Sequence, residues 1–546
     1  MLSVGGFALY AFTPWIAIGV IVVFFTVVAS YRQNVRAYPS GGGDYEVVST
    51  NLGERAGVFV ASALMVDYVL TVAVSISSAV ANISSILPSF GKSGVLLAIG
   101  LIVIVTLMNL RGVRESGTAF AIPTYGFILG IIAMVGWGIW QISHGNQIQA
   151  ESANWEIQAE TTATGVFLIF VLARAFSSGT TALTGIEAIA NGVPAFRKPK
   201  SKNAATTLLL LGVISMSMFT AITWLAIQTN VKVAEHDSDL IGLPAGETQK
   251  TVIAQVSQAV FADFQPGFFY ISIVTALILV LAANTAFNGF PVLGSILARD
   301  GYLPRQLHTR GDRLAFSNGI VFLAGAAIIL IIVYDASVSA LIQLYVIGVF
   351  VSFTLSQIGM VKHWNRHLAQ ETDPKARAKM KRSRAVNAFG FCLTGSVLII
   401  VLATKFTNGA YLVVIAMPIL YAIMRSVRRH YDRVALELEP AVDEKVTLPS
   451  RVHAIVLVSK IHKPTLRALA YARASRPSTL EGVTVSVDPG DTKAMSTDWE
   501  RRGISVPLKI LDSPYREITR PIVEYVRGLR RASTRDLVTV YIPEYV

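Results

Sequence analysis

Two carboxylic acids, Asp67 and Glu187, lie inside long apolar segments, LMVDYVLTVAVSISS and FSSGTTALTGIEAIANG. An ionised acid at the centre of a membrane helix costs at least about 2.5–3.5 kcal/mol, so it needs a partner or a water-filled cavity. Hydroxyl residues alone often serve as packing residues between membrane helices. Two acids on hydroxyl-rich faces instead favour a functional site. The polar residues that share a helical face with these acids are Thr71, Ser75 and Ser78 for Asp67, and Ser177, Thr180, Thr184 and Asn191 for Glu187.

Two glycines, Gly179 and Gly185, bracket hydroxyl residues in the second segment. Such a composition permits a membrane helix to unwind. Broken helices expose carbonyl oxygens and half-helix ends near the bilayer midplane, where transporters bind ions and substrates. A glycine pair can also serve close packing. The acid Glu187 in the same segment makes an unwound helix at a binding site the stronger interpretation.

The composition places the chain among membrane proteins. Of the 546 residues, 53% are hydrophobic and 15% are charged, against roughly 25% charged in soluble globular proteins. The single cysteine, Cys392, lies in an apolar stretch, which excludes a disulfide scaffold and a cysteine-rich metal site. The net charge of +13 could suggest nucleic-acid binding, but basic loops between membrane helices explain it better.

Apolar runs long enough to cross a bilayer predict eleven complete spans and one fragment. The run at 252–298 is too long for one crossing, so we predict a short outer helix at 252–263 and a tilted span that starts at Pro266. Residues 2–12 are apolar but too short to cross alone. The predicted spans lie at 14–31, 56–87, 93–110, 117–142, 166–193, 203–228, 252–298, 317–334, 337–361, 387–404 and 406–425.

Loop charge sets the orientation of these spans. One set of alternate loops is rich in arginine and lysine, with a long basic loop between Lys362 and Arg384. The other set carries only Lys92, Lys232, Lys250 and Lys405. The positive-inside rule therefore places the basic loops and the C-terminus in the cytoplasm. We accordingly predict a permease domain at 1–433, a polar linker at 434–450 and a cytosolic domain at 451–546.

The cytosolic segment alternates strand and helix patterns. Strand patterns appear in RVHAIVLVS, LEGVTVSVD, ISVPLKILD and DLVTVYIP, and helix patterns lie between them. Such alternation predicts a small α/β domain with a mostly parallel sheet. Apolar residues on both faces of the strand rows are typical of buried parallel strands.

Several segments together resemble the KimA-type potassium uptake permeases of the amino acid–polyamine–cation superfamily. They are SYRQNVRAYPSGGGDYEV, VDYVLTVAVSISS, MNLRGVRESG, ALTGIEAIANGVPAF and AANTAFNGFP, and the likeness extends over nearly the whole chain. The resemblance implies an α-helical fold of about twelve membrane helices with two inverted five-helix repeats. It also implies potassium uptake coupled to protons, in a bacterial plasma membrane.

The same resemblance implies a set of site residues. Asp67, Tyr68, Thr71 and Ser75 match the cation positions of the family's third helix, and Tyr345 matches that of the tenth helix. Thr184 and Glu187 match the sixth helix, where we assign proton coupling to Glu187. Neutral oxygens with limited charge suit potassium. Residues 1–12 match only the outer half of the family's broken first helix, so we expect either a start further upstream or an inactive product, and a longer C-terminus.

The cytosolic domain resembles the universal-stress-protein-like domain of these permeases, which implies binding of cyclic di-AMP and inhibition by it. The candidate contacts follow two predicted strands and are Ser459, His462, Ser513, Pro514, Tyr515 and Arg516. Loops and helix N-termini at the end of such a sheet suit phosphates. A purely structural dimerisation domain is the alternative reading of the same segment.

Two other functions stay open: an amino-acid or polyamine permease of the same superfamily, and a membrane sensor that does not transport. An enzyme is not expected, because no catalytic triad order, metal cluster or phosphate loop accompanies the spans. We expect no resident cofactor. The expected partners are the lipid bilayer, potassium, protons, cyclic di-AMP and a second copy of the chain, with no nucleic acid.

Overall fold

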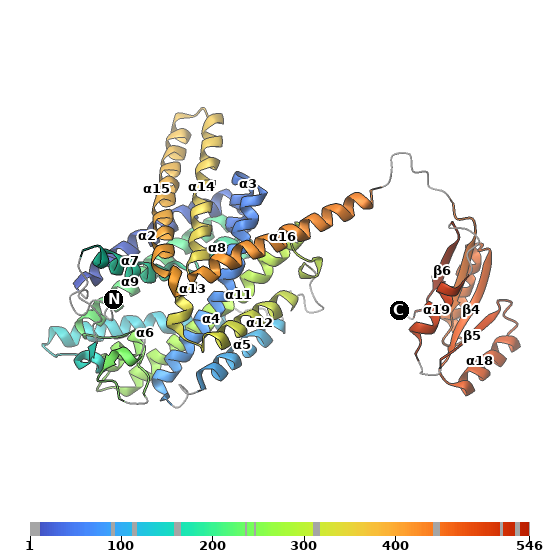
Figure 1. The fold of residues 1–546 in the computed structure, drawn as a ribbon, viewed down its shortest axis with the longest axis horizontal. Helices are drawn as coiled ribbons and strands as arrows, with labels where there is room; N and C mark the ends of the chain where they lie inside the picture. The colour runs from blue at the N-terminus through green and yellow to red at the C-terminus, as the bar shows by residue number, and fades with distance from the viewer. Residues whose placement is uncertain are drawn as a thin grey trace. The chain divides into compact units, whose positions relative to one another are not determined.

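The computed structural model describes residues 11–88, 93–111, 117–157, 165–234, 237–244, 247–308, 317–439, 448–513, 517–529 and 535–544. The chain divides into two compact units, Met1–Glu437 and Leu438–Val546. Figure 1 traces the first unit as a bundle of helices and the second as a sheet with helices. Each unit has its own hydrophobic core.

The first unit is a membrane bundle. Among the described residues, nine helices or helix pairs are long and apolar enough to cross a membrane, and α5 and α12 are shorter apolar helices. Together they account for all the predicted spans. Their bounds are α2 Thr13–Ala37, α4 Glu54–Ile86, α5 Gly94–Leu110, α6 Gly117–Ser143, α7 Gly165–Gly179 with α8 Ile186–Asn191, α9 Lys200–Gln228, α11 Gln265–Arg299, α12 Ser317–Val333, α13 Val338–Leu344 with α14 Ile347–Gln370, α15 Pro374–Lys405 and α16 Ala410–Glu437.

The long run at 252–298 is split as predicted. Helix α10, Val252–Val260, precedes α11, and Pro266 lies in the first turn of α11. Proline fits there because the first helical turn lacks partners for its N–H groups. Thr251 caps α10 by accepting a hydrogen bond from the amide of Ala254. The short outer helix is therefore confirmed as a separate element.

Two sequence-based boundaries were wrong. The basic stretch at 362–384 is not a loop: α14 continues to Gln370, and α15 starts at Pro374 after a tight turn that Asp373 caps. The two helices pack side by side (Figure 1). Helix α16 runs to Glu437, beyond the predicted start of the linker at 434, and residues 440–447 of that linker lie outside the described residues. In both places, charged residues with good helix propensity extend a helix past its apolar part.

The centre of the bundle is α4, which packs against α11, α14, α12, α16 and α5. A short helix, α3 (Gly43–Leu52), joins α2 to α4 and packs against α4, α14 and α8. Large buried side chains, including Phe24, Phe287 and Phe353, fill the core around these helices. The polar residues described below lie inside this packed centre.

The second unit is a four-stranded parallel sheet with strand order β5-β4-β3-β6. Its elements are β3 Val452–Leu457, α17 Lys463–Ala474, β4 Thr479–Ser486, α18 Pro489–Arg501, β5 Leu508–Asp512, α19 Thr519–Gly528 and β6 Leu537–Tyr541. The α/β prediction is confirmed. Burial on both faces holds for the central strands β3 and β4, while no residue of the edge strands β5 and β6 is fully buried.

Candidate functional site

The first wall of the site is the polar face of α4. Asp67 is 1% exposed, and neither of its carboxylate oxygens has a hydrogen-bond partner among the described residues. Gly348 of α14 lies against it: a Cβ there would come within 2.7 Å of the Ala63 carbonyl and 3.3 Å of the Asp67 Cβ. A buried carboxylate without a partner is unfavourable unless a cation or a proton joins it.

The second wall is a break in the membrane helix formed by α7 and α8. Thr184 has an extended backbone and Gly185 has φ 95°, the left-handed conformation that glycine adopts readily. The predicted unwinding is confirmed at Gly185 but not at Gly179, which stays helical and approaches Val20 closely. The predicted stripe from Ser177 to Asn191 is therefore not one continuous helical face.

Glu187 folds back over this break. Both of its carboxylate oxygens accept a hydrogen bond from the Gly185 amide, at 3.0 and 3.1 Å. The Glu187 carboxylate thereby lies at the N-terminus of α8, where the helix dipole favours a negative charge. The carboxylates of Glu187 and Asp67 lie near enough to interact electrostatically.

The third wall is a second break, between α13 and α14, which sequence reasoning missed. Tyr345 has an extended backbone and Val346 has φ 90°. The continuous span predicted at 337–361 is therefore two helices. A β-branched residue at positive φ is strained, and such strain concentrates at functional sites. The Tyr345 hydroxyl lies 3.0 Å from the Thr71 hydroxyl, and the Thr184 side chain is near enough to interact with it.

Tyr68 connects α4 to the far end of the first break. Its hydroxyl accepts a hydrogen bond of 2.7 Å from the Asn191 side chain. Gly289 of α11 leaves room for the ring, because a Cβ there would lie 2.7 Å from two of its carbons. The structure thus gathers Asp67, Tyr68, Thr71, Thr184, Glu187 and Tyr345 around the two breaks. Ser75, one turn beyond Thr71, is half-buried on the same helix.

Helix α3 carries a third buried acid that was absent from the predicted site residues. Asp44 is 1% exposed, and its Oδ2 accepts hydrogen bonds from the hydroxyls of Tyr31 and Ser352, the latter at 2.6 Å. The glycines before Asp44 pack tightly on α8: a Cβ on Gly43 would lie 1.7 Å from Asn191 Oδ1. The glycine run in SGGGDYE indicates a close approach of the backbone here, but not that the acid after it is enclosed.

The polar face of α4 ends under the outer helix α10. Thr251, the cap of α10, donates from its hydroxyl to Asn82 Oδ1 at 3.0 Å and from its amide to Ser85 Oγ at 3.2 Å. Asn82 and Ser85 lie in the last turns of α4. The outer end of this polar face is therefore covered.

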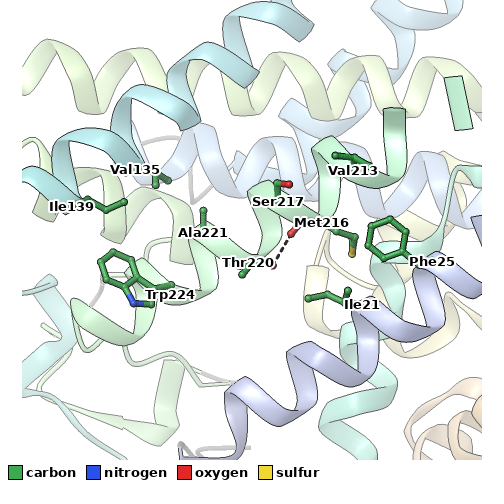
Figure 2. Close-up of a pocket in the computed structure, with 10 residues that line it drawn as sticks. All are labelled: Ile21, Phe25, Val135, Ile139, Val213, Met216, Ser217, Thr220, Ala221 and Trp224. Atoms are coloured by element: carbon green, nitrogen blue, oxygen red, sulfur yellow. Dashed lines mark hydrogen bonds between the residues drawn. The ribbon is translucent and has the colours of Figure 1, made fainter. Parts of the chain in front are cut away.

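A separate hollow of about 500 Å3 lies among α2, α6 and α9 and is mostly apolar. Figure 2 shows its lining, with Phe25, Ile139 and Trp224 among the large side chains. The Thr220 hydroxyl is directed to its own helix, where it donates to the Met216 carbonyl at 2.7 Å (Figure 2). This surface suits an apolar neighbour, because its lining offers only the hydroxyls of Ser217 and Thr220 and no charged group for a cation.

In the second unit, the predicted nucleotide contacts that the structure describes follow the carboxyl ends of two strands. Ser459 is exposed after β3, and His462 caps α17 by accepting from the Thr465 amide at 3.3 Å. Ser513 follows β5 and donates to the Glu517 carbonyl at 2.6 Å. The loops after β3 and β5 lie at the same end of the parallel sheet, but β4 separates the two strands. Pro514, Tyr515 and Arg516 lie outside the described residues.

Comparisons with known proteins agree with this architecture. Residues 2–424 match the family model described as Amino acid permease, and residues 451–546 match the KimA potassium transporter C-terminal domain. The chain is 36% identical over 535 residues to the Potassium transporter KimA of Bacillus subtilis (strain 168), which covers 97% of this chain and 83% of that relative. This chain is therefore a multi-pass membrane protein that belongs to the amino acid permease family and, within it, to the KimA-type transporters.

Proposed function

We propose that this chain carries potassium ions into the cell and couples their uptake to protons. The observation that carries the proposal is the buried carboxylate of Asp67, whose oxygens have no hydrogen-bond partner among the described residues. The hydroxyls of Thr71 and Tyr345 lie beside it at the second helix break. One carboxylate with several neutral oxygens matches what a weakly hydrated monovalent cation requires.

Each predicted ligand has a role in this proposal. Asp67 supplies the negative charge, and Thr71, Ser75 and Thr184 supply hydroxyl oxygens. Tyr345 supplies a phenol oxygen between α4 and the first break, because its hydroxyl bonds Thr71 of α4 and lies near Thr184. Tyr68 is held by Asn191, which fixes the direction of its hydroxyl.

The arrangement around Glu187 favours a bare cation over an amino acid. Transporters of zwitterions use the positive end of a half-helix to bind the substrate carboxylate. Here the Gly185 amide at that end already bonds both oxygens of Glu187. An amino-acid carboxylate would have to displace an acid of the chain itself. The relative from Bacillus subtilis is described as a potassium transporter, which points the same way.

Glu187 is the acid that we assign to proton coupling. It is buried, it lies at a helix break that can rearrange, and it interacts electrostatically with Asp67. A proton on Glu187 removes the repulsion between the two acids, so Asp67 stays ionised and can hold the cation. The site then carries one proton and one cation together, which links ion uptake to proton uptake.

We further propose that the C-terminal unit binds cyclic di-AMP, as a dimer, and that this ligand lowers uptake. In the strand order β5-β4-β3-β6, the chain changes direction between β3 and β6, and ligands bind at the carboxyl end of such a switch point. Ser459 and His462 follow β3 at this edge, and the phosphates would also meet Arg516. Inhibition requires that the ligand favour one transporter conformation over another.

The test is rescue of a bacterium that lacks its own potassium uptake systems. Cells that express the chain should grow at limiting external potassium, and uptake should resist competition by amino acids and polyamines. Restored uptake of amino acids or polyamines without potassium would make the chain a permease of that class. A protein that inserts correctly and moves neither would be a membrane sensor. Both results contradict the proposal.

A further inference from the structure

Asp44 is the one buried acid of the described membrane unit that the proposed function leaves without a role. It lies on α3, outside the membrane spans, and is surrounded by α2, α4, α8 and α14. Its side chain is 1% exposed, and the hydroxyls of Tyr31 and Ser352 donate to its Oδ2. Its Oδ1 has no hydrogen-bond partner among the described residues.

The environment of Asp44 contains hydroxyls and further acids. The titratable groups that interact with it are Tyr31 of α2, Glu187 of α8 and Tyr68 of α4. Helix α14 presents Ser352, and Ser356 one turn further on accepts a hydrogen bond from the side-chain Nδ2 of Asn34 at 3.0 Å. No lysine, arginine or histidine of the described residues forms an ion pair with it. Burial raises the pKa of Asp44, and the hydrogen bonds from Ser352 and Tyr31 oppose this rise.

Helix α3 also borders a polar hollow of about 510 Å3, lined by Gly42, Tyr45 and Glu46 on either side of Asp44 in the sequence. Arg299 and Arg428 line the same hollow. Arg299 ends α11, beside a loop whose basic residues the positive-inside rule assigns to the cytoplasm. Asp44 thus interacts with Glu187, and its neighbours in the sequence line a hollow on the cytoplasmic side. On the side of α3 that faces α8, Gly43 contacts Asn191, the last residue of α8.

We propose that Asp44 is a second proton-binding acid, which receives the proton that Glu187 releases and passes it to water in the cytoplasmic hollow. In this step an O–H bond of Glu187 breaks and an O–H bond forms at Oδ1 of Asp44. Deprotonation by water then restores the carboxylate, which Tyr31 and Ser352 stabilise. The inference rests on the proposed proton coupling and adds the inner half of the proton's route.

The decisive measurement is infrared difference spectroscopy of the full chain in lipid, recorded between low and high pH. The wild type should show the carbonyl band of a neutral carboxylic acid that Asp44→Asn removes. The matched control is Asp335→Asn, the same substitution at an exposed position between α12 and α13, so its variant should keep the band. A spectrum of Asp44→Asn identical to that of Asp335→Asn would overturn the proposal.

Uptake measurements in proteoliposomes give a second readout. A positioned proton-transfer acid contributes a large rate factor, of order 10²–10⁴, so Asp44→Asn should lower uptake about ten-fold or more and remove its dependence on internal pH. Asp335→Asn should retain both. Retention of the internal pH dependence in Asp44→Asn, with its loss in Glu187→Gln, would refute the role of Asp44 and keep the proposed function. An unchanged pH dependence in Glu187→Gln would instead refute the coupling role of Glu187, while the infrared band still decides whether Asp44 binds a proton.

Two milder variants keep the test valid if Asp44→Asn fails to fold. Tyr31→Phe and Ser352→Ala each remove one donor to the carboxylate and leave the acid in place. Loss of a hydrogen bond to the charged form raises a carboxyl pKa, so the midpoint of the infrared band should move to higher pH in both. A midpoint that does not move in either variant would contradict the proposal, because a purely structural acid would show only reduced stability.

Discussion

The hydroxyl oxygen of Thr71 lies 3.0 Å from the phenol oxygen of Tyr345, which joins the continuous helix α4 to the break between α13 and α14. These residues are 274 positions apart in the sequence. Their contact places a hydroxyl pair beside Asp67, and a cation that enters between them would replace their mutual hydrogen bond with coordination by both oxygens.

Tyr345→Phe removes the phenol oxygen and keeps the ring. Loss of one such interaction costs about 0.5–1.5 kcal/mol, so we expect the KM for potassium to rise up to about ten-fold with little change in protein level. Tyr411→Phe, on the exposed face of α16, is the control and should behave as the wild type. An unchanged KM in Tyr345→Phe would remove this residue from the site.

Asp67→Asn retains the shape of the side chain and removes its charge. Because Asp67 is the acid without a hydrogen-bond partner among the described residues, we expect uptake at limiting potassium to disappear while the protein still reaches the membrane. The control is Asp335→Asn, an exposed position with φ 49° that asparagine also tolerates. Near-normal uptake in Asp67→Asn would exclude it as the main ligand.

Glu187→Gln can still accept a hydrogen bond from the Gly185 amide through its side-chain oxygen, but it cannot exchange a proton at physiological pH. We therefore expect potassium uptake that persists and no longer accelerates as the external pH falls. Uptake recorded over a series of external pH values checks this. A variant whose pH profile parallels that of the wild type would show that the coupling proton binds elsewhere.

Gly185→Ala tests the geometry of the first break. A Cβ at this position meets no atom within 4 Å, so the cost comes from φ 95° alone, about 1–2 kcal/mol for an L-residue. Gly100→Ala in α5 also meets no atom within 4 Å and has ordinary helical geometry, so it should be neutral or stabilising. Thermal unfolding in detergent should show a lower Tm for Gly185→Ala and an unchanged or higher Tm for Gly100→Ala. Equal shifts in Tm would contradict the backbone conformation of Gly185.

Cyclic di-AMP should bind the full-length protein and lower its uptake. Arg516→Ala should weaken binding in calorimetry and relieve the inhibition to the same degree, because arginine pairs strongly with phosphate. The control is Arg501→Ala: Arg501 ends α18, a helix that runs back across the sheet, and pairs with Asp498. Absence of binding at high micromolar ligand, with ATP bound instead, would reverse the ligand assignment.

Sequence reasoning predicted the parts of the fold that depend on local patterns. Apolar length located the spans, and Pro266 with the run at 252–298 located the split between α10 and α11. The first helix break was predictable because Gly185 can adopt positive φ at little cost. The break at Tyr345–Val346 was not, because valine gives no such signal and tertiary packing imposes the strained conformation.

Burial of Asp44 was equally beyond the sequence. The segment at 43–52 reads as a polar connection between two spans, and nothing local indicates that an acid in it is enclosed. The groups that enclose it come from Tyr31 and from Ser352, 308 positions away. Only the arrangement of α2, α8 and α14 around α3 makes this acid a buried one.

The missing side chain of Gly43 has a mechanical consequence. Asn191 Oδ1 occupies the place of a Cβ at this position, and Pro194 crowds Gly41 in the same way. Helices α3 and α8 therefore interlock, so a tilt of α8 turns α3 with it. Tyr45 and Glu46 on α3 line the polar hollow, and the shape of that hollow must change with every tilt of the half-helix. A small solute that fits the hollow in only one of these shapes would stabilise one conformation and slow the transport cycle without contacting the ion.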